Sequence, residues 1–510
     1  YKVNKDVLGF IVNQRDSPDA VHGNDNEFSI GKVRYSSSLR FQGQSESAEV
    51  YIHPADLLGK RTALFGMTRT GKSNTVKKVI EATSQISSKA SSKILTGQKS
   101  TLEESLKSFD SNGAPKLPVG QIIFDINGEY ANKNLQDEGT AIFEKYKTNT
   151  LRYSILEKSD TTFKIMKVNF FNDIETGFGY ICSALEDDSG DYITSLTVVD
   201  LAKPAPTDFG ELIKYNKKKA IYSCCLSKAG FRPPSNYRLK FKCDSTLKKL
   251  VDEKFKNLDI ETGITVEDAE GWFLCAWENR NEKEFQVYKQ KNGKDWFSDE
   301  MKTLMVFLTQ KKENGQSVSG FDKFKKVAKM HTHSTDDSFE VDISKHVRTG
   351  GIVIIDLSQG DPTLQKVFSE RICKRIFADS MQRFTDAAPN NFIQFYFEEA
   401  HNLFPKKDDK DLSQIYNRIA KEGAKLNLGM VYATQEVSSI SSNILKNTQN
   451  WFIAHLNNED EIKELRKYYD FNDFADSLIR FSAKNDKGFV RMKTYSNPFV
   501  VPVQIDKFSV

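Results

Sequence analysis

Short apolar segments alternate with segments of helical spacing in two separate parts of the chain. In the first part, residues 61–65 and 121–125 predict strands and residues 73–82 predict a helix. The second part holds four more predicted strands and two helices, the strands at 351–357, 392–397, 428–433 and 451–456 and the helices at 364–383 and 412–425. Buried apolar strands that alternate with helices are typical of a parallel sheet covered by helices on both faces. The pattern therefore predicts an α/β core.

The rest of the chain follows other patterns. Short strands broken by turns are predicted near the start, at 7–12, 16–26, 28–35 and 49–53, and strands of this length suggest a small β-barrel. Residues 131–347 lack the strand–helix alternation and contain helical stretches such as 245–257, so we expect a mainly helical insertion there. We therefore expect three domains: an N-terminal β-barrel at 1–55, a core made of 56–130 and 348–510 with a C-terminal β extension, and the insertion at 131–347.

The charge and cysteine content exclude some classes of function. The net charge is +4, from 73 Lys and Arg against 69 Asp and Glu, so any contact with a polyanion must come from a local patch. No run approaches the roughly 18 apolar residues of a transmembrane helix, and no membrane association is expected. The six cysteines form no C-x-x-C pair, which favours a reducing, cytoplasmic location. His331 and His333 lack a partner pair, and a solvated loop is favoured there over a metal site.

A glycine-rich segment follows the first predicted strand and precedes a predicted helix. It reads Gly66-Met-Thr-Arg-Thr-Gly71-Lys72-Ser73 and matches the phosphate-loop pattern G-x-x-x-x-G-K-S/T at every fixed position. Lys72 is expected to reach the β- and γ-phosphates of ATP, and Ser73 to place its hydroxyl on Mg²⁺. The alternative is a plain glycine turn. The candidate nucleotide-binding residues of this segment are Gly66, Thr68, Arg69, Thr70, Gly71, Lys72, Ser73 and Asn74.

Two adjacent acids follow the predicted strand at 392–397. Ligands of open α/β sheets bind at the carboxyl ends of the strands, which is where Glu398 and Glu399 are expected. Glu399 is the candidate general base, and Glu398 the candidate contact to Mg²⁺. An acidic start of a helix is the alternative.

Two other predicted strand ends carry polar residues. Asp125 and Glu129 end the strand at 121–125 and could order the attacking water or the metal shell, with a plain turn as the alternative. Gln435 follows the strand at 428–433 and could bind the γ-phosphate or the water as a sensor.

In this order, these segments resemble the HerA/FtsK class of P-loop ATPases, and HerA proteins in particular. The resemblance rests on Gly66 to Ser73, Asp125 to Tyr130, Glu398 to Pro405 and Ala433 to Gln435. It covers roughly residues 1–130 and 348–510. Membership would imply an N-terminal β-barrel, a RecA-like core and a hexameric ring that threads double-stranded DNA. The segment around the phosphate loop is also similar to HerA proteins of bacterial antiphage systems, which act with a separate effector such as a nuclease or a sirtuin-type NAD hydrolase.

Two positions depart from the family pattern. The family usually has Asp-Glu where this chain has Glu398-Glu399, so the first acid of the pair has a longer side chain here. The family also tends to supply an arginine finger from a segment that here reads Lys421-Glu-Gly-Ala-Lys425. Lysine cannot copy the fork of donors of arginine, so Arg418, Arg61 or a lysine would have to take that role.

The leading hypothesis is therefore an ATP-hydrolysing hexameric DNA translocase or helicase that works with a partner effector. The main alternative is an ATP-gated ring that assembles an effector without moving DNA. A conjugation-type coupling ATPase is disfavoured because no transmembrane segment is found, and a GTPase because no N-K-x-D motif follows the core. For DNA contact, the candidates are Lys406, Lys407 and Lys410, in a charged loop after the acidic pair. A solvated loop is an equal alternative there.

Overall fold

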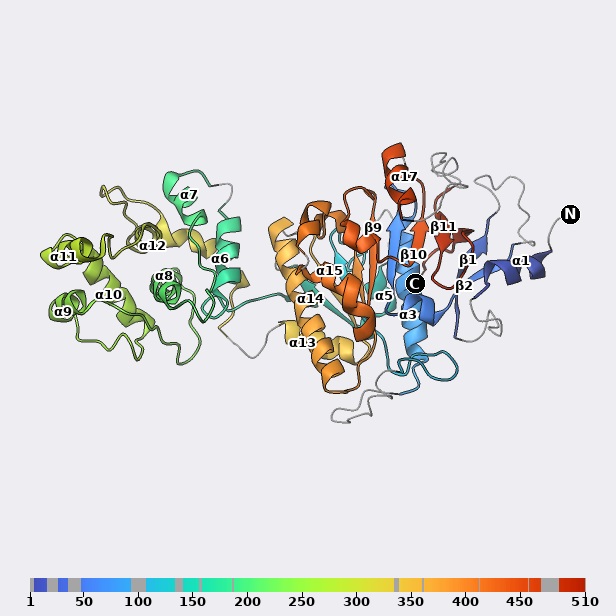
Figure 1. Cartoon of the computed structure of the whole chain (residues 1–510), viewed down its shortest axis with the longest axis horizontal. Helices are drawn as coiled ribbons and strands as arrows, with labels where there is room; N and C mark the ends of the chain where they lie inside the picture. Colours follow the sequence, from blue (N-terminus) through green and yellow to red (C-terminus); the bar gives the residue numbers. More distant parts are fainter. Residues whose placement is uncertain are drawn as a thin grey trace. The chain divides into compact units, whose positions relative to one another are not determined.

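The computed structural model describes residues 4–15, 26–34, 47–92, 107–133, 141–155, 158–185, 188–333, 339–359, 362–411, 413–456, 458–468 and 486–509. The chain divides into two compact units (Figure 1). The first, here called the sheet unit, comprises Tyr1–Lys164 and Glu340–Val510. The second, here called the helical unit, comprises Ile165–Phe339. No helix among the described residues is both long and apolar enough to cross a lipid bilayer.

A single sheet of twelve strands, in the order β2-β1-β12-β11-β10-β3-β9-β8-β4-β7-β5-β6, organises the sheet unit. The strands from β10 to β5 in this order run parallel to one another. Their bounds are β10 Asn450–Ile453, β3 Arg61–Phe65, β9 Leu428–Thr434, β8 Ile393–Phe397, β4 Gly120–Asp125, β7 Ile352–Asp356 and β5 Thr150–Ser154. These elements confirm the predicted mixed α/β core with a large, mostly parallel sheet.

Antiparallel strands extend one edge of the sheet. They are β11 Phe489–Lys493, β12 Val501–Ile505, β1 Phe28–Val33 and β2 Glu49–Ile52. Among the described residues, β1 and β2 therefore belong to the open sheet, joined to it through β12, and form no separate barrel there. The strand expected at 16–26 lies almost wholly outside the described residues.

The N-terminal segment predicted as a strand at 7–12 is instead the helix α1, Lys5–Val12. The side chain of Asn4 accepts a hydrogen bond from the backbone N–H of Val7 and so caps this helix. Leu8, Ile11 and Val12 are spaced three and four positions apart, which suits one face of a helix as well as a short strand. The strand prediction was wrong because it used only the apolar run, which fits a helix equally well, and did not consider the N-cap residue Asn4, which favours a helix.

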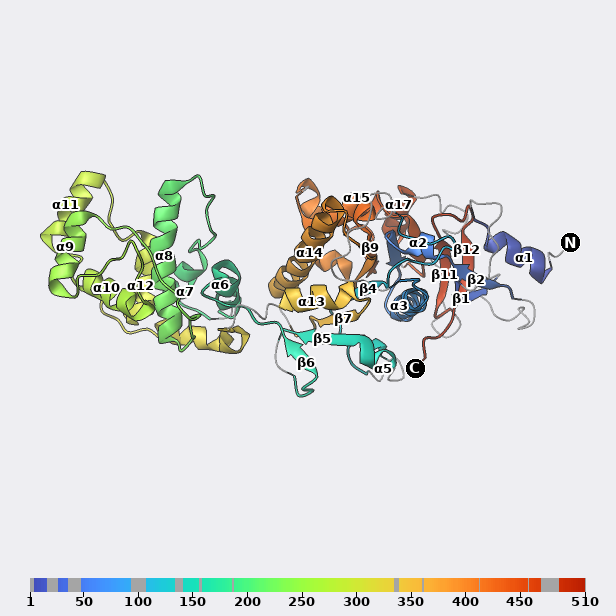
Figure 2. The same ribbon diagram turned by 90° about the horizontal axis from the view of Figure 1, so that it is seen from below.

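Helices cover both faces of the parallel strands. Helix α3, Lys72–Ser88, packs Val76 and Val79 into a core shared with Tyr396 and Val431. On the opposite face, Phe397 of β8 meets Tyr416 of α15, Ile415–Glu422, at a ring-centroid distance of 5.4 Å. Successive side chains of a strand point to opposite faces, and so Tyr396 and Phe397 serve different layers. Figure 2 shows α15 and α3 on opposite sides of the sheet.

The remaining helices of the sheet unit are α2 Pro54–Leu57, α5 Ile142–Lys145, α13 Phe339–Arg348, α14 Pro362–Thr385, α16 Ser442–Leu445 and α17 Glu459–Arg466. Strand β6 is Phe163–Ile165. Because β5 pairs with β7, residues 150–154 belong to the sheet, and the helical unit starts later than the insertion expected from 131.

The described part of the helical unit consists of α-helices, one long 3₁₀ segment and connecting loops. The helices are α6 Ile174–Ser183, α7 Asp191–Thr197, α8 Phe209–Lys228, α9 Ser245–Lys254, α10 Val266–Glu278, α11 Lys283–Asn292 and α12 Asp299–Thr309. The 3₁₀ segment is Gly320–Met330. Helices α10 and α12 both pack on α8, which therefore forms the centre of this unit.

Candidate functional site

The glycine-rich loop at 66–71 joins the end of β3 to the start of α3 and is held by neighbouring backbone. The N–H of Gly66 donates to the carbonyl of Thr434, at 3.3 Å, and the N–H of Met67 donates to the carbonyl of His455, at 3.0 Å. The carbonyl of Thr70 accepts from the N–H of Gly488, at 2.8 Å. Backbone hydrogen bonds to three other segments of the chain thus hold the loop in place.

Gly71 is required by this loop geometry. Its φ is +95°, a left-handed conformation that side chains rarely adopt, and an added Cβ would lie 2.7 Å from the backbone nitrogen of Gly488. Gly71 immediately precedes α3, so the N–H groups of the first turn of the helix face the space beside the loop. The predicted strand–loop–helix context is therefore present.

Lys72 and Glu399 form the central ion pair of the site. The Nζ of Lys72 lies 3.3 Å from Oε1 of Glu399, and both side chains are largely buried. Ser73 Oγ donates to Oε1 of Glu398 at 3.5 Å. The in-register pairs Phe65 with Thr434 and Phe397 with Tyr432 show that β3, β9 and β8 end at one edge of the sheet. The sequence-predicted phosphate-loop residues and acidic pair therefore lie together.

Glu399 itself is held in an uncommon backbone conformation, with φ 41° and ψ 50°. Its second oxygen, Oε2, is buried, has no hydrogen-bond partner among the described residues, and lies 3.6 Å from Nδ1 of His401. Nδ1 of His401 is also 2.9 Å from Oγ1 of Thr434. His401 and Thr434 thus flank the candidate base. The sequence analysis gave them no role, although both stand within the motif segments.

Glu398 is only 4% exposed and sits among other acids. Burial raises the pKa of its carboxyl well above the usual range, and the charges of Asp125 and Glu129 raise it further. Tyr130 donates its hydroxyl hydrogen to Oε1 of Glu398, at 3.3 Å. A buried carboxyl surrounded by carboxylates favours any added positive charge.

A divalent cation fits this chemistry. One oxygen each of Glu129, Glu398 and Glu399 is buried without a hydrogen-bond partner among the described residues. Carboxylate and hydroxyl oxygens are the ligands that Mg²⁺ prefers. Among the described residues, no group of three or more His, Cys, Asp or Glu side chains is placed so that it could hold a metal ion.

Asp125 has a structural role that the sequence left open. It is fully buried, and its two oxygens accept hydrogen bonds from the backbone N–H groups of Glu129, Tyr130 and Ala131, at 2.9 to 3.0 Å. Burial raises the pKa of Asp125 to about 6, helped by the charge of Asp356 on the neighbouring strand. This geometry matches the turn alternative, in which Asp125 shapes the loop that carries Glu129 and Tyr130.

The other candidate residues occupy varied positions. Gln435 is half-buried and follows β9 directly, at the same sheet edge as Gly66. Thr68 and Arg69 are exposed at the tip of the loop. Asn74 is engaged elsewhere: its side chain donates to the carbonyl of Asp506 and accepts from the N–H of Phe508, so it anchors the C-terminal tail.

The two arginine candidates for a finger differ in accessibility. Arg61 is 5% exposed at the opposite end of β3 from the phosphate loop, and it donates to the carbonyl of Asn447. Arg418 is 41% exposed on α15, pairs with Glu422 at 3.4 Å and lies over the ring of Phe377. Only Arg418 of these two presents its guanidinium at the surface.

The charged loop after the acidic pair forms a 3₁₀ turn, Lys406–Lys410. Its two acids hold it in place: Asp408 pairs with Lys366 at 3.0 Å, and Asp409 accepts from Ser441 and Ser442. Lys406 is exposed and lies 3.5 Å from Glu464. Lys407 and Lys410 are exposed and form no ion pair with a described residue.

Comparisons with known proteins give distant likenesses. No protein-family model and no curated protein matches the chain. Among solved structures, the bacterial conjugative coupling protein TrwB is 11% identical with a TM-score of 0.41, over 99% of this chain and 93% of that one. VirB4 of Thermoanaerobacter pseudethanolicus is 10% identical with a TM-score of 0.40, over 94% and 96%. The genome packaging NTPase B204 from Sulfolobus turreted icosahedral virus 2 is 12% identical with a TM-score of 0.24, over 31% and 68%.

Proposed function

We propose that the chain is a Mg²⁺-dependent ATP hydrolase whose site lies between the glycine-rich loop and the acidic pair. The observation that carries this proposal is the placement of Lys72 and Ser73 within reach of Glu399 and Glu398, at 3.3 and 3.5 Å. A phosphate-binding loop directly opposite a carboxylate is the arrangement that phosphoryl transfer to water requires.

Each residue has a distinct task in this proposal. The backbone of the loop and the ammonium of Lys72 hold the phosphates and stabilise the charge that develops on them. Glu399 takes the proton of the attacking water, and Gln435 orients that water or the γ-phosphate. Ser73 and Glu398 would hold Mg²⁺, which neutralises phosphate charge when bound. Binding of the phosphates has to draw Lys72 away from Glu399, and this frees the carboxylate to act on water.

Replacing Lys72 by Ala tests the assignment. Hydrolysis should fall by at least about a hundredfold, because the charge of Lys72 acts in a site with little water. Lys89→Ala, an exposed lysine at the end of the same helix, is the matched control and should keep wild-type turnover. Undiminished hydrolysis in a folded Lys72→Ala protein would refute the site.

We further propose that the hydrolase is a hexameric motor of the HerA type that moves double-stranded DNA and serves a partner effector, a nuclease or an NAD hydrolase. The motif resemblance supports this, together with the exposed Lys407 and Lys410 beside the candidate base segment. The alternative is an ATP-gated scaffold that assembles the effector without moving DNA. Stimulation of ATP turnover by duplex DNA supports the motor, and turnover indifferent to DNA supports the scaffold.

A further inference from the structure

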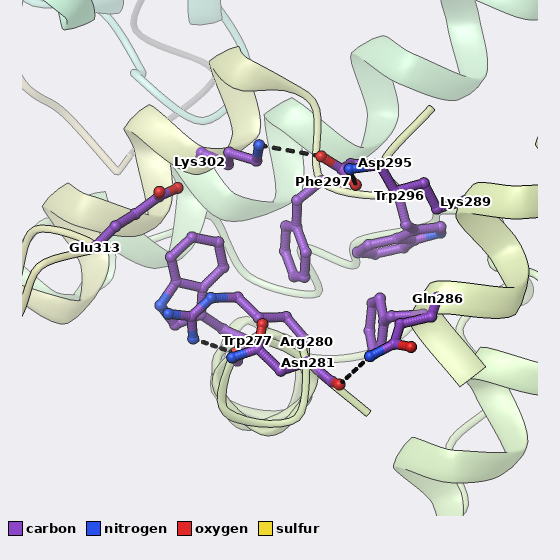
Figure 3. Close-up of a pocket in the computed structure, with 11 residues that line it drawn as sticks. Trp277, Arg280, Asn281, Gln286, Lys289, Asp295, Trp296, Phe297, Lys302 and Glu313 are labelled. Carbon is purple, nitrogen blue, oxygen red and sulfur yellow. Dashed lines mark hydrogen bonds and ion pairs between the residues drawn. The ribbon is translucent and has the colours of Figure 1, made fainter. Parts of the chain in front are cut away.

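Buried polar atoms without a hydrogen-bond partner among the described residues occur in both units. In the helical unit, Nε1 of Trp296 is such an atom, and its ring packs with Trp277, Phe285 and Phe297 in the aromatic cluster of Figure 3. These rings are at most 8% exposed, so the cluster is part of the core of that unit. In the sheet unit, Oε2 of Glu399 is such an atom. Because burial without a partner costs a charged group more than a neutral one, the surroundings of Glu399 are the more informative.

Two side chains flank the carboxylate of Glu399, one at each oxygen. Oε1 lies 3.3 Å from Nζ of Lys72, and Oε2 lies 3.6 Å from Nδ1 of His401. In the proposed reaction the phosphates draw Lys72 away, and the largely buried carboxylate then loses the charge that balances it, which is costly in a site with little water. Of these two flanking side chains, His401 is the one that remains beside the carboxylate.

The imidazole of His401 is itself held in place by Thr434. Nδ1 of His401 lies 2.9 Å from Oγ1 of Thr434, and Thr434 is completely buried. The same Oγ1 accepts a hydrogen bond from the backbone N–H of Glu436 at 3.1 Å, and the carbonyl of Thr434 accepts one from the N–H of Gly66 at 3.3 Å. The orientation of the imidazole is therefore tied to the end of β9 and, through it, to the start of the phosphate loop.

The position of the imidazole proton follows from these neighbours, since the partners of a histidine decide which ring nitrogen is protonated. A proton on Nδ1 can be donated to Oγ1 of Thr434 and also faces the carboxylate of Glu399. A proton on Nε2 alone would turn a lone pair of Nδ1 toward Oε2, which is unfavourable. If Nδ1 and Oε2 moved about half an ångström closer, they would reach the hydrogen-bond range of roughly 2.7 to 3.2 Å.

We propose that His401 is a positioning residue that holds the carboxylate of Glu399 once bound phosphates have displaced Lys72. The Nδ1–H group donates to Oε2, and Oε1, released from Lys72, faces the attacking water and accepts its proton. His401 contacts neither the water nor the nucleotide in this arrangement and acts only through Glu399. The inference rests on the proposed ATP hydrolase and adds a residue to its site.

Steady-state ATP hydrolysis by the full chain tests the proposal. His401→Ala should lower kcat about tenfold or more, the order expected when a reacting group is misplaced. The KM for ATP should change less than about threefold, because the imidazole holds the base and not the nucleotide. His401→Asn should recover part of the loss, since its amide nitrogen can lie close to the position of Nδ1, whereas His401→Gln should recover less. Asn402→Ala, an exposed residue of the same 3₁₀ turn, Ala400–Asn402, is the matched control and should keep wild-type turnover.

A double variant separates positioning from structural damage. Single-turnover hydrolysis should slow about tenfold when His401→Ala is introduced into the wild type, but hardly at all when it is introduced into Glu399→Gln, because the residue acts through the carboxylate. A loss by the same factor in both backgrounds would overturn the proposal. Full turnover in His401→Ala, with turnover lost in Lys72→Ala and Glu399→Gln, would refute this inference and leave the hydrolase assignment standing. Undiminished turnover in Lys72→Ala and Glu399→Gln would refute the hydrolase site and this inference with it.

Discussion

Glu399 combines three features that rarely coincide in one residue: positive φ, a largely buried carboxylate and an ion pair with Lys72. A residue other than glycine in such a conformation costs about 1 to 3 kcal/mol, and the surrounding structure has to over-determine it. The carboxylate of Glu399 forms an ion pair with Lys72 and lies near the imidazole of His401. Local strain at this position supports a functional rather than a structural role for the carboxylate.

Glu399→Gln should bind ATP and hydrolyse it at least about a hundredfold more slowly, because the amide keeps the shape but cannot accept the proton of water. Single-turnover hydrolysis and a nucleotide-binding assay, run on the same preparation, separate the two effects. The control is Glu436→Gln, an exposed glutamate just beyond β9. Turnover near the wild-type rate would move the base to Glu398 or Glu129.

At the scale of elements, the turn after β4 depends on one buried carboxylate. The carboxylate of Asp125 accepts hydrogen bonds from three backbone N–H groups of the turn. The turn places the hydroxyl of Tyr130 within hydrogen-bonding distance of Glu398, the candidate Mg²⁺ contact. A change in the turn is therefore expected to alter the surroundings of Glu398.

Asp125→Asn should lower stability by about 1 to 3 kcal/mol, because an amide offers one acceptor oxygen and leaves buried donors unpaired. The same change should alter the pH dependence. The pKa of Asp125, about 6 in the folded protein, exceeds its ordinary value of 3.8, so the folded state retains a proton that the unfolded state releases. Wild-type stability should therefore fall as pH rises from about 4 to about 6.

Thermal unfolding at a series of pH values measures both effects. The decline between about pH 4 and pH 6 should be shallower in Asp125→Asn than in the wild type, since the variant has no carboxyl at this position. A parallel decline in both proteins would assign the pH effect to other groups.

The elements that sequence predicts best are those whose burial is uniform. Strands β3, β4, β7, β8 and β9 are apolar runs buried along their whole length, and their predicted and observed bounds differ by at most one residue at each end. The helix α1 was not predicted because the spacing of its few apolar residues suits a helix as well as a strand. The hydrogen bond from the backbone N–H of Val7 to the side chain of the N-cap residue Asn4 favours the helix. Uniform apolar character therefore predicts the central strands, whereas the state of α1 depends on a local hydrogen bond at its N-terminus.

The sequence predicts the two segments that form the candidate site, the glycine-rich loop and the acidic pair, but not which of their side chains contact each other. The loop and the acidic pair each follow a strand, and the rule that parallel strands share an edge brings them together. The pairing of Lys72 with Glu399 joins residues 327 positions apart, and nothing in the sequence says which of two adjacent glutamates makes it. The positions of His401 and Asn74 likewise follow from tertiary contacts, with Thr434 and with the C-terminal tail.

At the scale of the whole molecule, an ATP site completed by a neighbour needs an accessible cation. Arg418→Ala should lower hydrolysis about tenfold or more while nucleotide affinity changes much less, because a finger acts on transition-state charge. Arg375→Ala, an exposed arginine on α14, is the control. Mass photometry that finds only an active monomer would overturn both the ring and the finger.

DNA engagement by the proposed ring rests on few charges, since the net charge is only +4. Three lysines in each of six subunits would give about eighteen charges around a channel. Lys406, however, lies 3.5 Å from Glu464, whereas Lys407 and Lys410 have no ion-pair partner among the described residues. The number of unpaired positive charges around the channel is then about twelve, from two lysines in each of six subunits. Lys406, which is paired with Glu464, serves as a control within the same loop.

The double variant Lys407→Ala/Lys410→Ala should weaken duplex binding and lower DNA-stimulated turnover while basal turnover survives. Its affinity should also depend less steeply on salt, because each lost phosphate contact removes about one released counterion from the slope. Lys406→Ala should change the slope much less. Binding isotherms across a salt series measure this directly. If both variants and the wild type share one salt slope, the loop does not contact DNA. If wild-type ATP turnover is also unchanged by duplex DNA, the ATP-gated scaffold becomes the better account of the ring.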